Sequence, residues 1–147
     1  MGEFARVLGR STRKVGDMVL SPLTQNMKAA YENWLEERAL SRVEAKRGRL
    51  SDSAWAELYE TTVELIDGGG FSWGTRVSRT SLRTPEGSDV LLLLLLQPSQ
   101  PEITLEATRA FFDAHTKEVN DAVRYLVSSD PNSSPPEEVT EETATQE

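Results

Sequence analysis

The sequence predicts an all-α fold, a small irregular helical bundle built on an antiparallel helix hairpin with disordered termini. Apolar residues in the central part of the chain recur at spacings of three and four, which is the period of a helix face. Hydroxyl side chains that can cap a helix precede most of these segments. Both ends of the 147-residue chain are polar, so we divide it into a flexible N-terminal arm (1–22), a helical domain (23–128) and a disordered acidic tail (129–147).

The first helix follows the arm, whose isolated apolar residues predict at most a weak amphipathic segment. Thr24 can accept a hydrogen bond from the free amides of a helix that begins at Gln25. Basic side chains gather in the last turn of this helix, where cations offset the negative end of the helix dipole. Its apolar face is formed by Met27, Ala30, Tyr31, Trp34 and Leu35.

The second helix has the clearest amphipathic pattern in the chain. Ser51 can cap its start, and three glycines, Gly68 to Gly70, can end it. We expect one face to be buried as core, formed by Trp55, Leu58, Tyr59, Thr62, Leu65 and Ile66.

The two helices are joined by a short loop and should pack as an antiparallel hairpin. Charge supports the pairing, because basic residues of the first helix (Arg38, Arg42, Lys46) can approach acidic residues of the second (Asp52, Glu57, Glu60). Exposed pairs of this kind contribute about 0 to 1 kcal/mol each. Most of the stability should therefore come from burial of the large aromatic side chains Tyr31, Trp34, Trp55 and Tyr59.

A loop with two aromatic residues, Phe71 and Trp73, follows the glycines. These side chains either plug the end of the hairpin or form an exposed binding spot. The next segment, Arg76 to Leu82, is a candidate short helix. Its spacing places Arg76, Arg79 and Arg83 on one ridge, which is either a solvated face or a contact for an acidic partner such as the chain's own tail.

Val90 to Leu96 is an uninterrupted apolar run, and we predict a helix because six of its seven residues are leucine. Thr84 and Pro85 fit the start of that helix. A helix that is apolar on all sides must be surrounded. A body of this size has few other helices to surround it, so we expect some leucines either to meet another chain or to form ordinary core.

Two further helices should follow the break at Pro98 to Pro101. Thr104 can cap the first and Thr116 the second. Their apolar faces are formed by Leu105, Thr108, Phe111 and Phe112 in one, and by Val119, Ala122, Val123 and Leu126 in the other.

Composition excludes most familiar catalytic and metal sites. Cysteine is absent and histidine occurs once, so disulfides, thiolate zinc sites, cysteine nucleophiles and multi-histidine sites are excluded. His115 is best explained as a surface cap or turn residue, and the three glycines lack the lysine and preceding strand of a phosphate-binding loop. The sequence predicts a protein that is not an enzyme and has no catalytic residue, metal or cofactor.

Charge and hydropathy bear on partners and location. The formal net charge is −8, and six acidic residues with no Lys or Arg follow residue 128, which leaves the rest of the chain at −2. A nucleic-acid partner is therefore not expected. The apolar run of seven residues is far shorter than the roughly 20 needed to cross a membrane. With no secretion signal near the start, we expect a cytoplasmic protein without a membrane partner.

Three stretches resemble a family of small helical proteins encoded in the tail-gene clusters of tailed phages and prophages, the tail assembly chaperones. They are YENWLEER at 31–38, GFSWG at 70–74 and LRTPEG at 82–87. The resemblance implies a helper in the host cytoplasm that holds the long helical tape-measure protein until the tail tube assembles. It implies no catalytic residues.

We therefore predict a non-catalytic protein that binds a helical client and that is a candidate homo-oligomer. The alternatives are a structural or adaptor component of a phage particle or of a bacterial regulatory complex, and a hydrolase that relies on carboxylates. The predicted partner-binding residues are Phe71, Trp73, Leu91, Leu92, Leu93, Leu94, Leu95 and Leu96.

Overall fold

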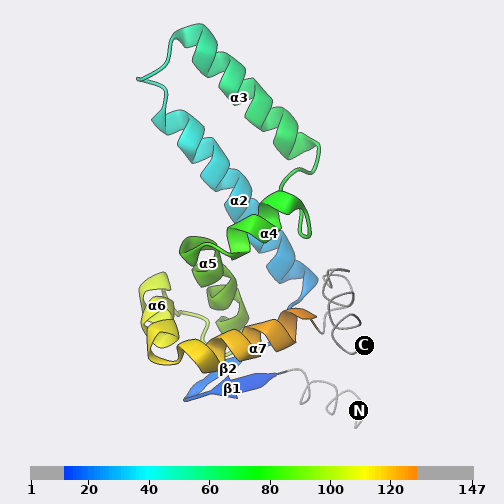
Figure 1. Cartoon of the computed structure of the whole chain (residues 1–147), viewed down its shortest axis with the longest axis vertical. Helices are drawn as coiled ribbons and strands as arrows, with labels where there is room; N and C mark the ends of the chain where they lie inside the picture. The colour runs from blue at the N-terminus through cyan, green and yellow to red at the C-terminus, as the bar shows by residue number, and fades with distance from the viewer. Residues whose placement is uncertain (1–11, 129–147) are drawn as a thin grey trace, which may run out of the picture.

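The computed structural model describes residues 12–128 of the chain and confirms the mostly helical fold (Figure 1). The predictions for residues 1–11 and for the acidic tail lie outside this range. The described part has six helices and one two-stranded hairpin. In chain order they are β1 (Arg13–Val15), β2 (Met18–Leu20), α2 (Gln25–Ala45), α3 (Asp52–Asp67), α4 (Arg76–Leu82), α5 (Pro85–Leu96), α6 (Leu105–Ala114) and α7 (Thr116–Ser128).

Thr116 does not cap α7 as predicted, because it is the first residue of that helix and its hydroxyl donates to the carbonyl of Phe112 at 2.9 Å. The other four predicted helix starts are confirmed. In each case the side-chain oxygen of the cap accepts a hydrogen bond from the backbone amide three residues later, which satisfies one free N–H of the first turn. Gly68 caps the end of α3, and Gly69 follows it with φ of +79°, a value that favours glycine. The confirmed N-caps are Thr24, Ser51, Thr84 and Thr104.

The end of the predicted flexible arm is folded instead. Strand β1 pairs antiparallel with β2, with Val15 opposite Met18, and Gly16 between them takes φ of +58°. Val15 and Leu20 are buried in the core, and the amide of Ser21 donates to the carbonyl of Leu95 at 2.8 Å. The arm prediction is therefore wrong for residues 13–20, because burial of these apolar side chains holds the hairpin against the helices.

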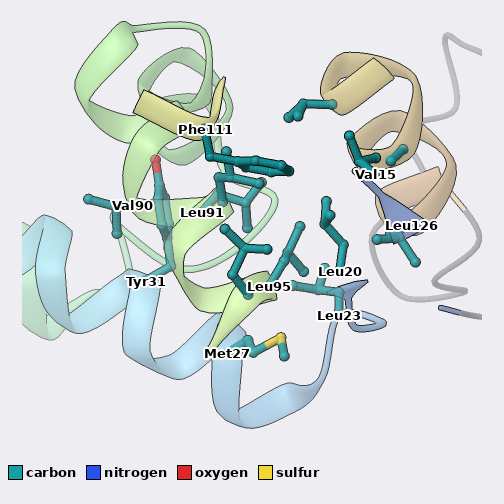
Figure 2. Packing of buried hydrophobic residues seen from close by; sticks show 14 of the residues in the cluster. Val15, Leu20, Leu23, Met27, Tyr31, Val90, Leu91, Leu95, Phe111 and Leu126 are labelled. Carbon is teal, nitrogen blue, oxygen red and sulfur yellow. The ribbon is translucent and has the colours of Figure 1, made fainter. Parts of the chain in front are cut away.

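The core is centred on α5 (Figure 2). Helices α2, α6 and α7 and strand β2 surround it, and their side chains meet those of the leucine run. In Figure 2, Leu95 lies among Leu20, Leu23 and Met27, and Leu91, one turn earlier in α5, lies beside Phe111. The side chains of Leu95 and Leu96 are completely buried. This small core therefore combines residues from both ends of the described chain.

A second packing point joins α2, α4 and α5. The hydroxyls of Tyr31 and Ser81 are hydrogen bonded at 2.8 Å, and both side chains are buried. Gly87 of α5 permits this approach, because a Cβ at that position would lie 2.1 Å from the Ser81 carbonyl oxygen and 2.6 Å from the Tyr31 hydroxyl. Trp73 adds an edge-on ring contact with Tyr31, at 5.7 Å between centroids.

Helices α2 and α3 form the predicted antiparallel hairpin, which we call the arm hairpin (Figure 1). Its outer part projects away from α5, α6, α7 and the strands. Near the tip, the Trp55 indole donates to the carbonyl of Val43 at 2.8 Å and stacks on Tyr59 at 5.3 Å between centroids. The guanidinium of Arg47 lies over the Trp55 ring, 4.2 Å from its centre.

The predicted charge pairing across the arm hairpin is not found. Within residues 12–128, the carboxylates of α3 form no ion pair with α2. Arg38 instead pairs with Glu86 of α5, and Arg47 pairs with Glu44 of its own helix at 3.4 Å. The aromatic side chains of the hairpin are also less buried than expected. Tyr31 is buried, but Trp34 and Trp55 are half-buried and Tyr59 is exposed.

Candidate protein-interaction surface

The leucine run does not form the exposed surface that the sequence suggested. Leu91, Leu92, Leu95 and Leu96 are at most 4% exposed, and Leu93 and Leu94 are half-buried. The expectation that the body lacked enough mass to enclose this helix overlooked the β1–β2 hairpin, which covers part of it. Leu91, Leu92, Leu95 and Leu96 therefore form core, and Leu94 packs against it. Partner binding by the leucine run stays a prediction.

The aromatic loop residues act as a plug. Phe71 is buried and Trp73 is half-buried. The backbone amide of Trp73 donates to the carboxylate of Glu32 in α2 at 2.6 Å, and its ring packs against Tyr31. Of the two roles considered for this loop, pinning the base of the arm hairpin is the one that the structure supports.

Helix α3 carries the apolar surface that the fold leaves uncovered. None of its 16 residues is buried, although the sequence predicted a core face. Within residues 12–128, α2 is the element that packs along it. Tyr59 and Leu65 are 44% and 45% exposed, and Leu50 just before the helix is also exposed. We define the α3 face as these three residues together with the half-buried Trp55 and Leu58.

The charge of the arm hairpin is strongly segregated. Helix α3 contains five carboxylates and no Lys or Arg, while the end of α2 and the following loop are basic. An approaching protein therefore meets an apolar row bordered by negative charge on α3, and positive charge near the tip. The acidic residues of α3 are Asp52, Glu57, Glu60, Glu64 and Asp67.

A groove of about 360 Å³ lies in the angle between α2 and α4, and we call it the α2–α4 groove. Its floor is apolar and includes Leu35, Ala39, Phe71 and the exposed Val77. Its rim is basic, and two of the rim arginines form no ion pair within residues 12–128. The rim arginines are Arg38, Arg42 and Arg76.

A second groove of about 560 Å³ lies between α5, α6 and α7, and we call it the α5–α7 groove. Leu91 and Leu92 contribute the small exposed parts of their side chains to it. Arg83 and Arg124 provide two positive charges at its edge. Each groove combines an apolar lining with arginines, a composition that suits binding of an apolar segment with acidic neighbours.

Ionisable groups of the described residues do not converge on either groove as a catalytic set would. His115 caps the end of α6, as predicted, and its Nδ1 lies 3.3 Å from the Glu118 carboxylate at the surface. Burial raises the pKa of the Tyr31 phenol above its ordinary value of 10.0, while the bond to Ser81 and the charge of Arg38 act in the opposite direction. This tyrosine is a packing residue between helices.

Two further findings concern metals and membranes. Among residues 12–128, no group of three or more His, Asp or Glu side chains is arranged to hold a metal ion. In the same range, no helix combines the length and the apolar content required to span a bilayer.

The sequence missed this surface for a physical reason. Helical periodicity identified the apolar face of α3, but that face alone does not indicate whether the chain itself covers it. The grooves depend on the proximity of α2 to α4 and of α4 to α7, which are far apart along the chain. Comparisons with protein-family models, curated proteins and solved structures found no match to this chain.

Proposed function

We propose that this chain is a non-catalytic protein-binding helper that holds a helical client on its arm hairpin. The observation that supports the proposal is the exposure of α3. A 16-residue amphipathic helix packs mainly against α2, buries none of its residues, and projects from the body of the fold. Helices of this kind gain most of their stability by burying the apolar face, so the α3 face fits a further helix.

The dimensions and charge of α3 define the client. A helix of 16 residues is about 24 Å long, enough for a client helix to pack along it for about four turns. Tyr59 and Leu65 are 44% and 45% exposed, and their spacing of six residues places them about 120° apart around α3. A third helix can cover one of them and widen the hairpin into a bundle. Because the neighbouring charges on α3 are all negative, the client should carry basic residues beside its apolar stripe.

The resemblance to tail assembly chaperones suggests a specific client, the helical tape-measure protein of a phage tail. A tape-measure protein is long and needs protection of its apolar helical surface until the tube subunits assemble. A projecting hairpin that offers a shallow apolar row suits repeated, reversible contacts with such a protein. In this proposal the helper works in the host cytoplasm and leaves before the particle is complete.

A pair of variants tests the role of the α3 face. The double variant Tyr59→Asp with Leu65→Asp places charge on both exposed apolar positions, and we expect it to fold and to lose at least about tenfold in affinity for the client. The matched control, Ala56→Asp with Thr61→Asp, adds the same charge to exposed positions of the same helix. The control should bind like the original chain.

The measurement is co-expression with the tape-measure protein of the same gene cluster, followed by light scattering on the purified complex. Retention of binding by the Tyr59/Leu65 variant would remove the α3 face from the proposal. If the unchanged chain leaves the tape-measure protein insoluble but binds a basic amphipathic helical peptide through α3, protein binding stands and the tail-assembly role is wrong. Stable incorporation into a finished particle would favour the structural alternative.

A further inference from the structure

Four arginines on α4 and α7 lack an ion-pair partner within residues 12–128, and we call them the arginine track. Two other arginines of the domain have carboxylate partners on α5. Arg38 pairs with Glu86, and Arg109 pairs with Asp89 at 2.7 Å. The residues of the arginine track are Arg76, Arg79, Arg83 and Arg124, and all four are exposed.

The arginine track connects the two grooves. Arg76 lies on the rim of the α2–α4 groove, while Arg83 and Arg124 border the α5–α7 groove. Spacings of three and four place Arg76, Arg79 and Arg83 on one side of α4. Since α4 has seven residues and is about 10 Å long, these positive charges form a short continuous path from one apolar lining to the other.

We propose that the chain's own C-terminal segment, residues 129–147, docks on the arginine track. The segment carries six carboxylates and no Lys or Arg, so its charge is complementary to the track. It also contains one branched aliphatic residue, Val139, between two pairs of glutamates at 137–138 and 141–142. This pattern matches an apolar lining with arginines on its rim, because the glutamates can pair with the rim while Val139 enters the groove.

The position where the described chain ends favours this occupant over an acidic segment from another protein. Helix α7 ends at Ser128, and Val127 lines the same groove as Arg83. Helix α7 therefore ends at the groove that Arg83 and Arg124 border. The nine residues from 129 to 137 can extend over at most about 30 Å, which exceeds the length of α4. Tethering also gives the tail an effective local concentration on the order of millimolar, which separate acidic proteins rarely reach.

Docking of the tail has a consequence for both grooves. A separate acidic ligand of either groove must first displace a tethered competitor, so the tail acts as an internal inhibitor of these sites. The inference does not depend on the proposed function, because the α3 face lies on the arm hairpin and lacks the residues of the track. Exposed ion pairs are weak and screened by salt, so docking should be reversible and sensitive to ionic strength.

Paramagnetic relaxation enhancement in the full chain tests the proposal. The chain has no cysteine, so Thr143→Cys provides a single site for a nitroxide label in the tail. We expect strong loss of amide signal intensity at 76–83 and weak loss at the arm hairpin tip, residues 46–55, with the α4 effect at least halved in about 0.5 M salt. The triple variant Arg76→Gln, Arg79→Gln, Arg83→Gln should abolish the effect on α4.

The matched control removes three positive charges from the arm hairpin tip, with Lys46→Gln, Arg47→Gln and Arg49→Gln. It should leave the α4 effect unchanged. Amide shifts of α5 report whether each variant folds, and the salt series on the unmutated track needs no substitution besides Thr143→Cys. The proposal is overturned if α4 and the arm hairpin tip are affected equally, if salt has no influence, or if the Arg→Gln triple retains the effect. An effect seen only between labelled and unlabelled copies would assign the tail to a second copy instead.

Discussion

Helices α3 and α5 differ in how far the rest of the fold covers them. α5 is rich in leucine, and of the two roles predicted for this run, ordinary core or contact with another chain, its buried leucines form the centre of the core. α3 has the clearest amphipathic pattern and was the candidate core helix, yet it has no buried residue. A helix that is apolar on all sides has no stable alternative to enclosure. An amphipathic helix needs cover on one face, and that cover can come from another molecule.

The largest difference between the two helices should appear in stability. Leu95→Ala in α5 removes a fully buried side chain, and we expect the free energy of unfolding to fall by about 2 to 5 kcal/mol. Leu65→Ala in α3 removes a side chain that is 45% exposed, and we expect a loss of less than about 1 kcal/mol. Urea denaturation of the two variants measures both values. Equal losses would contradict the assignment of core and surface.

The next effect concerns the close approach of α5 to α2 and α4. Gly87→Ala places a Cβ against the Ser81 carbonyl and the Tyr31 hydroxyl, and we expect a loss of about 1 to 3 kcal/mol in the free energy of unfolding. Gly48→Ala is the matched control, because a Cβ there meets no atom within 4 Å. Thermal melts of both variants make the comparison, and a Gly87→Ala melt that matches the original chain would show that the helices can separate without cost.

A smaller effect is expected at the hydroxyl pair. Tyr31→Phe removes the hydrogen bond with Ser81, and we expect a loss of about 1 kcal/mol at neutral pH. Burial raises the pKa of the Tyr31 phenol, so the neutral form is favoured by folding. Its contribution to stability is complete below the ordinary pKa of 10.0 and is lost as the pH rises from there through the folded-state pKa.

Urea midpoints of the original chain and of Tyr31→Phe, measured between roughly pH 8 and roughly pH 11, test this dependence. The original chain should lose more stability than the variant over this interval. Parallel curves would mean that ionisation of Tyr31 is not linked to folding.

Local signals in the sequence were sufficient for part of this fold. The caps at Thr24, Ser51, Thr84 and Thr104 depend on contacts within one helical turn, so residue type and spacing alone predict them. The β1–β2 hairpin was missed because strands of three residues are too short to show an alternating pattern. It becomes stable through Val15 and Leu20, whose neighbours come from α5 and α7.

The candidate surface was less accessible to sequence reasoning than the helices. The α2–α4 groove requires Leu35 and Val77 to meet across a large sequence separation. The charge pairs expected along the arm hairpin were wrong because Arg38 has a partner on α5, a contact that no local pattern indicates. The α3 face is exposed because no other element of the described chain covers it. The helical period of the sequence identifies an apolar face but does not indicate whether another element will pack on it.

Hydrogen exchange, measured with and without the client, tests the central claim most directly. Amides of α5 should exchange at rates close to those of global unfolding, since they lie in the core. Amides of α3 should exchange much faster in the free chain, by at least about a hundredfold, and should become protected when the client is added. The account is contradicted if α3 is protected as strongly as α5 in a free monomer, or if client binding protects the body and leaves α3 unchanged.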